Sequence, residues 1–179
     1  MARPLRALEK AGVETTTVPA SSTRGLDPEK IRAALRRNTR ALVTCHASNV
    51  SGAISPIAEL GALCRENGIV FILDAAQNAG SLPIDVASMG IDLLAFPGHK
   101  GLLGPQGTGR LFVAPGICLA TLVEGGTGIE SVSPEQPEDL PWRLESGTPN
   151  TPGIAGLAAG LGVVLERGVE ALFSIAATL

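Results

Sequence analysis

Polar side chains capable of chemistry follow three apolar runs in this 179-residue sequence. The runs are "ALVTC", "IVFIL" and "DLLAF", and each has the composition of a buried strand. Because ligands bind beyond the carboxyl ends of parallel strands, we expect the polar residues after these runs to meet at one edge of a sheet. These residues are His46, Ser48, Asn49, Asp74, Gln77, His99 and Lys100.

Lys100 is one of only three lysines, and it lies in the glycine-rich stretch "PGHKGLLGPQGTG". A lysine amine can form a Schiff base with a carbonyl compound. A carboxylate such as that of Asp74 can keep a pyridine nitrogen protonated, and this amine–carboxylate pair is what pyridoxal phosphate chemistry requires. The surrounding glycines allow a backbone to approach a flat ring closely. The pattern therefore favours a pyridoxal phosphate site.

Each of these residues also has a simpler structural interpretation. Asp74 could cap a helix over "AAQNAG", and Lys100 could be a solvated loop lysine. His46 could cap a strand and bond a carbonyl, and His99 could contact backbone only. The functional interpretation depends on all of them converging at one sheet edge.

The elements that would position these residues alternate between strands and helices. Such alternation predicts an α/β fold with three layers, in which a mostly parallel sheet has helices on both faces. We predict strands over residues 13–20, 39–45, 69–74, 92–96 and 109–114. We predict helices over residues 1–12, 27–38, 55–68, 85–89, 151–168 and 168–179. The expected N-caps are Asp27, Ser55 and Thr151, and residues 116–149 are expected to be extended loops.

The composition narrows the function classes. Apolar residues make up 45% of the chain, which indicates a folded domain with a core. The net charge of -3 and the scattered basic residues argue against nucleic-acid binding, and no run is long enough to span a bilayer. The three separated cysteines, without a CxxC pair or a secretory signal, favour the cytoplasm and no structural metal site.

An ordered set of motifs resembles the class V pyridoxal-phosphate-dependent aminotransferases, nearest to the cysteine desulfurase and selenocysteine lyase branch. The motifs are "HASNVSG", "DAAQ", "FPGHKGLLGPQGTG" and "RLESGTPNTPGIAGL", and the similarity runs from about Arg3 to Leu179. The resemblance implies the large domain of the fold type I aminotransferases. It also implies a reaction that converts L-cysteine to L-alanine and leaves the sulfur bound to the enzyme.

The resemblance also implies a role for individual residues. Lys100 would hold the cofactor as a Schiff base and move protons at the substrate α-carbon. Asp74 would pair with the pyridine nitrogen, and Gln77 would bond the phenolic oxygen of the ring. Asn49 would lie near that oxygen and the substrate carboxylate, and His99 would reach the phosphate. Thr127 in the "GGTG" turn would reach the phosphate of a neighbouring subunit in a homodimer.

Several features expected from the family are not found in this sequence. Pro97 stands where Ser or Thr is common, and a proline has neither a hydroxyl nor an N–H for the phosphate. By the resemblance, the phosphate-binding turn and a ring-stacking histidine would precede residue 1. The nucleophilic cysteine and a carboxylate-binding arginine would follow residue 179. We therefore interpret residues 1–179 as a partial large domain, with an N-terminal segment and a C-terminal small domain missing.

None of the three cysteines of this chain matches the family nucleophile. Cys45, Cys64 and Cys118 are expected to be core or incidental residues. By the resemblance, the whole enzyme would pass its sulfur to an acceptor protein.

Three alternatives remain open at this stage. The protein could be another class V enzyme, namely an aminotransferase, an epimerase or a selenocysteine lyase. It could also be an inactive truncated domain that only folds or dimerises. A phosphate or nucleotide binder is disfavoured, because "GHKGLLGPQGTG" matches neither the P-loop nor the dinucleotide-binding pattern.

Overall fold

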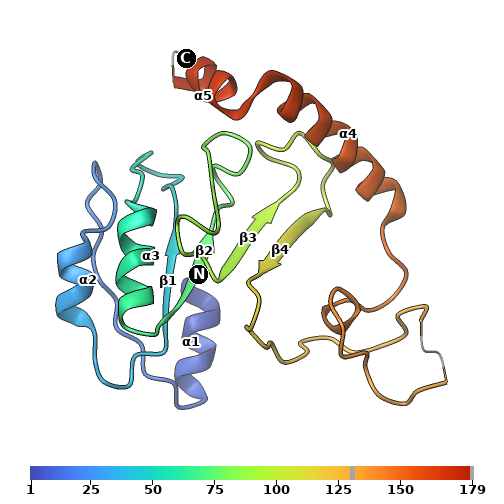
Figure 1. Ribbon diagram of the computed structural model, residues 1–179, viewed down its shortest axis with the longest axis horizontal. Helices are drawn as coiled ribbons and strands as arrows, with labels where there is room; N and C mark the ends of the chain where they lie inside the picture. The colour runs from blue at the N-terminus through green and yellow to red at the C-terminus, as the bar shows by residue number, and fades with distance from the viewer. Residues whose placement is uncertain (130–131, 178–179) are drawn as a thin grey trace.

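A computed structural model describes residues 1–129 and 132–177 and contains one four-stranded sheet (Figure 1). The strands lie in the order β1-β2-β3-β4, so that β1 and β4 form the edges. The first three strands are parallel, and β4 runs antiparallel to β3. The sheet confirms the prediction of a mostly parallel α/β fold. The strands are β1 (Ala41–Cys45), β2 (Val70–Asp74), β3 (Leu93–Pro97) and β4 (Gly109–Val113).

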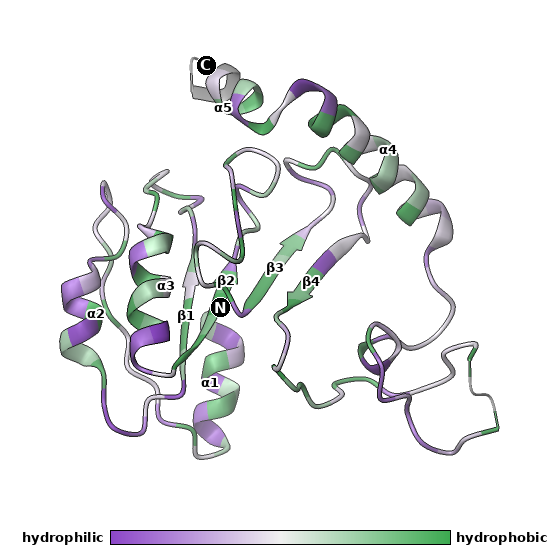
Figure 2. Cartoon of the chain, viewed as in Figure 1, coloured by the Kyte–Doolittle hydropathy of each residue, from purple (hydrophilic) through white to green (hydrophobic). Residues whose placement is uncertain are grey.

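Five α-helices and one short 3-10 helix account for the remaining regular structure of the described residues. They are α1 (Ala2–Lys10), α2 (Pro28–Ala34), α3 (Ile57–Glu66), η1 (Trp142–Leu144), α4 (Thr151–Arg167) and α5 (Val169–Ala177). Figure 2 shows mainly hydrophobic residues on the strands, with a hydrophilic segment in β4, and a mixture of hydrophilic and hydrophobic residues on α1, α2 and α3. Among the described helices, none is long and apolar enough to cross a membrane.

The core forms where α3 packs on the sheet. Leu60 of α3 and Phe71 and Leu73 of β2 are completely buried. Gly61 allows α3 to approach closely, because a Cβ at this position would overlap the main-chain carbonyl of Met89. Removing a side chain such as that of Leu60 from a close-packed core typically costs about 2–5 kcal/mol. This packing fixes β2 and therefore the residues at its carboxyl end.

The predicted N-cap Asp27 is confirmed for α2, whereas the predicted N-cap Ser55 is wrong for α3. The Asp27 side chain accepts the N–H of Glu29 at 3.0 Å at the start of α2. The cap of α3 is Pro56, which has no side-chain cap. The Ser55 hydroxyl is used elsewhere, because it accepts the N–H of Leu26 at 3.3 Å.

Helix α4 also begins differently from the prediction. Its N-cap is Asn150, whose side-chain oxygen accepts the N–H of Gly153 at 3.0 Å, and Thr151 is already the first helical residue. Asparagine caps at least as well as threonine, and here its position suits the N–H of Gly153. The buried face of α4 carries Gly153, Leu157, Gly160 and Val164.

Two predicted elements are absent from the described structure. Residues 13–20 are extended but are not a strand, because among the described residues no backbone hydrogen bond pairs residues 14–20 with a neighbour. Residues 85–89 form a turn and not a helix. The Asp85 carboxylate closes this turn by accepting the N–H groups of Ala87 and Ser88 at 3.0 and 2.9 Å. Gly90, with φ +63, prevents the turn from continuing as a helix.

The predicted loop region after β4 is confirmed for the described residues. Between β4 and α4 the only regular element is η1, and residues 130–131 lie outside the described structure. This region lies apart from the sheet in Figure 1.

Candidate functional site

Asp74 occupies the centre of the candidate site, because it ends the strand that lies between β1 and β3. It is paired in register with Cys45 on one side and with Ala95 on the other. The side chain is half-buried, and its Oδ1 accepts the N–H of Ala76 at 2.9 Å. Within the described residues, no cation pairs with this carboxylate. The strand end therefore presents an oriented negative charge.

Gln77 follows Asp74 on a tight turn. The Ala75 carbonyl accepts the N–H groups of Asn78 and Ala79 at 3.1 and 3.0 Å, so the backbone turns by about one helical turn. Gln77 is exposed on this turn, whereas Asn78 is buried. The local chain therefore holds an amide donor at the same edge as the Asp74 carboxylate.

The loop after β3 closes on itself and leaves its lysine free. Gly98 donates its N–H to Thr108 and accepts the N–H of Gly104, both at 2.8 Å. His99 and Lys100 are exposed, and within the described structure neither side chain has a hydrogen bond or an ion pair. The loop thus holds an unpaired amine beside the end of β3.

Close backbone contact brings the lysine loop against the turn that follows Asp74. A Cβ added to Gly101 would lie 2.5 Å from the Ala79 carbonyl oxygen. A Cβ added to Gly80 would lie 2.5 Å from the Gly101 carbonyl oxygen. Only glycine permits this approach, because any side chain at either position would overlap the backbone of the other segment. This contact explains the glycines at these two positions of the sequence. The loop that carries the Lys100 amine therefore packs directly against the turn that follows the Asp74 carboxylate.

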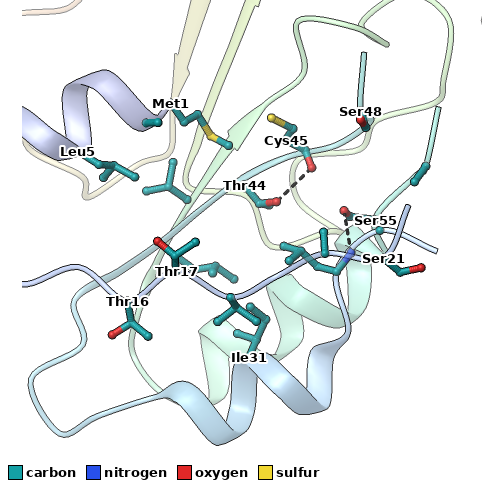
Figure 3. Close-up of a pocket in the computed structure, with 18 of the residues that line it drawn as sticks. Met1, Leu5, Thr16, Thr17, Ser21, Ile31, Thr44, Cys45, Ser48 and Ser55 are labelled. Atoms are coloured by element: carbon teal, nitrogen blue, oxygen red, sulfur yellow. Dashed lines mark hydrogen bonds between the residues drawn. The ribbon is translucent and has the colours of Figure 1, made fainter. Parts of the chain in front are cut away.

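Asn49 lies on the loop that follows β1. Ser48 anchors this loop, since it donates its N–H to Ala53 at 2.9 Å and accepts the N–H of Gly52 at 3.0 Å. Asn49 is exposed at the tip and lines a cavity of about 860 Å³, drawn in Figure 3. Neither Asp74 nor Lys100 lines that cavity. Asn49 thus belongs to the same sheet edge, but strand β2 lies between the strand that precedes Asn49 and the strand that precedes Lys100.

A buried histidine–asparagine pair supports the site and was missed in the sequence. The Asn78 amide nitrogen lies 2.6 Å from Nδ1 of His46, and the two residues are 3% and 5% exposed. The His46 N–H also donates to the Asp74 carbonyl at 3.0 Å. Burial lowers the pKa of His46, so the ring is neutral at neutral pH. Asn78 stands among small residues in "DAAQNAG", and nothing local distinguishes it from a surface residue.

Two of the three cysteines of this chain lack the properties of a nucleophile. Burial raises the pKa of Cys64 to about 11. Burial and then the neighbouring Asp74 carboxylate raise the pKa of Cys45. Cys118 is exposed in the loop after β4. The expectation of core residues is confirmed for Cys64, which is buried in the cluster around Leu60.

The arrangement fits the ring of pyridoxal phosphate. A half-buried carboxylate without an ion pair suits a protonated pyridine nitrogen, and an unpaired amine on a glycine loop suits an aldehyde. The phosphate end is less complete, because Pro97 lacks an N–H and that of Gly98 is occupied by Thr108. The His99 imidazole is exposed on this loop.

Comparison with protein families gives one match that covers nearly the whole chain. The model described as aminotransferase class-V matches residues 2–179. The chain is 35% identical over 171 residues to a probable cysteine desulfurase of Methanothermobacter thermautotrophicus, covering 93% of this chain and 43% of the relative. It is 39% identical over 171 residues to the cysteine desulfurase IscS of Anaeromyxobacter dehalogenans, covering 94% of this chain and 39% of the relative.

Solved structures give a similar result. The apo cysteine desulfurase of Thermococcus onnurineus NA1 is 33% identical, with a TM-score of 0.82 over 92% of this chain and 42% of that one. The cysteine desulfurase CsdA of Escherichia coli is 29% identical, with a TM-score of 0.83 over 93% of this chain and 43% of that one. These likenesses confirm the predicted fold class. The chain spans about two-fifths of the length of the relatives it matches.

Proposed function

The chain belongs to the class-V aminotransferase family, and on this premise we propose that it forms the lysine-bearing part of a pyridoxal-phosphate-dependent cysteine desulfurase. The substrate would be L-cysteine, and the products would be L-alanine and enzyme-bound sulfur. The observation that carries the proposal is the unpaired amine of Lys100 on a loop that packs against the turn following Asp74. The desulfurase relatives at 35–39% identity support the reaction class.

The cofactor, when bound, withdraws electrons from the α-carbon of an attached amino acid and so makes its proton removable. Lys100 would hold the cofactor through Nζ and would then carry the proton to and from that carbon. The loop backbone supports this role, because Leu103 donates its N–H to the Lys100 carbonyl at 3.0 Å and fixes the lysine backbone.

Four other residues would bind and orient the cofactor. The Asp74 carboxylate would accept a hydrogen bond from the pyridine nitrogen, which raises the fraction of protonated ring. A hydrogen bond to a charged partner of this kind contributes roughly 1.5–3 kcal/mol. Gln77 and Asn49 would donate amide hydrogens to the ring oxygen, and His99 would donate to the phosphate.

The sulfur-accepting step is assigned to none of the cysteines in this chain. A thiolate is the reactive form of cysteine, and burial disfavours it at Cys45 and Cys64. We propose that the accepting cysteine, like the small domain, belongs to polypeptide outside residues 1–179, that the whole enzyme is a homodimer in the cytoplasm, and that it passes sulfur to an acceptor protein. The 179 residues alone would then bind cofactor without releasing alanine from cysteine.

Covalent trapping tests the proposal directly. The purified chain is mixed with pyridoxal phosphate and reduced with borohydride, and the modified lysine is located by mass spectrometry. We expect one adduct, on Lys100, at cofactor concentrations where the exposed Lys30 of α2 remains unmodified. Equal labelling of Lys10, Lys30 and Lys100 would refute the cofactor site and favour an inactive domain.

Matched variants separate a specific site from simple accessibility. Asp74→Ala should remove the Lys100 adduct at low cofactor, because the ring loses its charged partner. Asp85→Ala changes an exposed carboxylate that only closes a turn, so labelling should persist. Labelling that is unaffected by Asp74→Ala would contradict the assigned role of Asp74.

The other class V reactions remain the second candidate. The matched family is described as aminotransferase class-V, and the trapping reaction would give the same lysine adduct for an aminotransferase, an epimerase or a selenocysteine lyase. Assay of the whole enzyme for alanine and sulfide with L-cysteine as substrate separates these reactions from desulfuration.

A further inference from the structure

One residue, His46, holds both ends of the segment that runs from Asp74 to Asn78. At the start of the segment, the main-chain N–H of His46 donates to the Asp74 carbonyl at 3.0 Å. At its end, the Asn78 amide nitrogen lies 2.6 Å from Nδ1 of the His46 ring. His46 is itself anchored, because its carbonyl accepts the N–H of Ser55 at 2.8 Å. Gln77 lies inside this segment, so His46 brackets both Asp74 and Gln77.

The chemistry of the two side chains fixes the direction of the hydrogen bond between them. The amide nitrogen of Asn78 can only donate, so Nδ1 of His46 accepts and carries no proton. The lowered pKa of His46 agrees with this arrangement, because a ring that stays neutral keeps Nδ1 available as an acceptor. The single proton of the neutral ring is then on Nε2.

Filling the core does not by itself account for this polar pair. Asn78 and His46 are 3% and 5% exposed, and the side-chain oxygen of Asn78 is buried without a hydrogen-bond partner among the described residues. A buried acceptor without a partner is unfavourable, and two apolar side chains of similar shape would fill the same space without this penalty. A hydrogen bond has a direction, however, and can therefore fix the orientation of a turn more narrowly than apolar contacts do.

We propose that His46 and Asn78 form a positioning pair, which sets the spacing between the Asp74 carboxylate and the Gln77 amide. This inference rests on the proposed function, in which Asp74 bonds the ring nitrogen of the cofactor and Gln77 bonds its ring oxygen. The cofactor ring is rigid, so these two atoms are a fixed distance apart and the two side chains have to match that distance. Groups that bind a rigid ligand in this way need neighbours that lock their geometry.

Cofactor binding and the visible absorption of the bound cofactor test the pair. Asn78→Leu removes the amide donor at similar side-chain size. The dissociation constant of pyridoxal phosphate should rise about three- to tenfold, as expected when one hydrogen bond is weakened. When the cofactor is bound to a lysine, its absorption changes as the proton shared by the Schiff-base nitrogen and the ring oxygen is lost. Hydrogen bonds to that oxygen favour the loss, so the midpoint pH of the change should rise by about half a unit to one unit in the variant.

A double-mutant cycle shows whether the pair acts through Gln77. Gln77→Ala removes the exposed amide that would bond the ring oxygen and should itself raise the midpoint pH. If Asn78 only positions Gln77, adding Asn78→Leu to Gln77→Ala should produce little further rise in the midpoint. An equal rise with and without Gln77 would overturn the proposal.

Two further variants separate positioning from general stability. His46→Asn keeps an acceptor oxygen close to the place of Nδ1, so it should retain the wild-type midpoint, whereas His46→Leu should raise it. Asn67→Ala is the matched control, because its amide donates to the Leu63 carbonyl at 2.7 Å at the end of α3. This variant should lower stability towards urea and leave the midpoint unchanged. A midpoint that rises equally in Asn67→Ala and Asn78→Leu would overturn the proposal, because the effect would then follow stability.

The outcomes distinguish failure of the pair from failure of the proposed function. If the wild-type chain forms no specific adduct on Lys100, the proposed function fails and this inference falls with it. If the adduct forms and Asn78→Leu has the wild-type dissociation constant and midpoint, only the positioning role of the pair is overturned. Should Asn78→Leu not fold, Asn78→Ala and His46→Leu provide the same comparison, and wild-type values in a folded variant would overturn the proposal.

Discussion

At the scale of single residues, the two histidines of this chain differ in a way that their sequence neighbours do not reveal. His46 is 5% exposed and bonded to Asn78, whereas His99 is exposed on the lysine loop. Both follow an apolar run and both precede a small or basic residue, so sequence reasoning could place them at a sheet edge but could not separate their environments. His46 has a structural environment because the turn after β2, which carries Asn78, packs over it.

This difference predicts a pH dependence of stability. Burial lowers the pKa of His46 from 6.5, so the unfolded chain takes up a proton that the folded chain resists. Stability should therefore be complete above about pH 6.5 and should fall as the pH is lowered below this value. Urea unfolding at pH 7.5 and 5.5 measures the loss. His46→Asn should reduce the difference between the two pH values, whereas His99→Asn should retain it; an equal effect of the two variants would contradict the prediction.

The three thiols should differ in reactivity. Cys118 is exposed, whereas burial raises the pKa of Cys64 to about 11 and also raises that of Cys45. Iodoacetamide at pH 8 should therefore modify Cys118 first and Cys64 last, because the thiolate is the reacting form. Mass spectrometry of timed samples gives the order in which the cysteines are modified. In urea, where the chain is unfolded, the three cysteines should be modified at similar rates. Early modification of Cys64 in the native chain would show that α3 is not docked as described.

At the scale of elements, the sequence predicted most of what depends on local patterns. The four strands β1 to β4 were predicted to within a few residues because each is an apolar run with turn residues on both sides. Residues 13–20 have the same local pattern but are not a strand, since strand formation requires a neighbour that no local pattern reports. The cap of α3 was missed for a similar reason, because Leu26 is 29 residues away from Ser55 in sequence.

Two glycines of helix α4 should respond in opposite ways to substitution by alanine, with stability lowered at one and raised at the other. A Cβ at Gly160 would lie 2.5 Å from the Leu102 carbonyl oxygen, whereas a Cβ at Gly162 would meet nothing within 4 Å. Gly160→Ala should push α4 from the lysine loop and destabilise the chain by about 1–3 kcal/mol. Gly162→Ala should stabilise it by about 0.5–1 kcal/mol, as expected for a helical position. Urea denaturation of both variants measures the difference, and equal shifts would contradict the docking of α4.

At the scale of the whole molecule, the candidate site is complete on one side only. The amine comes from the loop after β3 and the carboxylate from the end of β2, and the loop packs against the turn after β2 through Gly80 and Gly101. The phosphate end has few donors, the pKa values of Cys45 and Cys64 are raised, and Cys118 lies in the loop after β4. Under the proposed function, this chain, which spans about two-fifths of the length of its relatives, would hold and orient the cofactor ring. Sequence motifs indicated both the candidate site residues and the parts of the site expected outside residues 1–179, whereas the close approach of Gly80 and Gly101 became visible only in the structure.

The exposed apolar surface leads to a final prediction about the chain as a whole. Leu122, Val132 and Leu165 are 95%, 99% and 78% exposed, and further large apolar side chains are exposed on α4. Exposed large apolar side chains of this kind are available for contact with other protein. In light scattering, the 18.3 kDa chain should therefore show a mass that rises with concentration. Replacing these three residues by Asp should lower the association without changing the circular dichroism spectrum. A constant mass of 18.3 kDa across the concentration range would contradict the prediction, because it would show that these exposed apolar side chains do not cause the chain to associate.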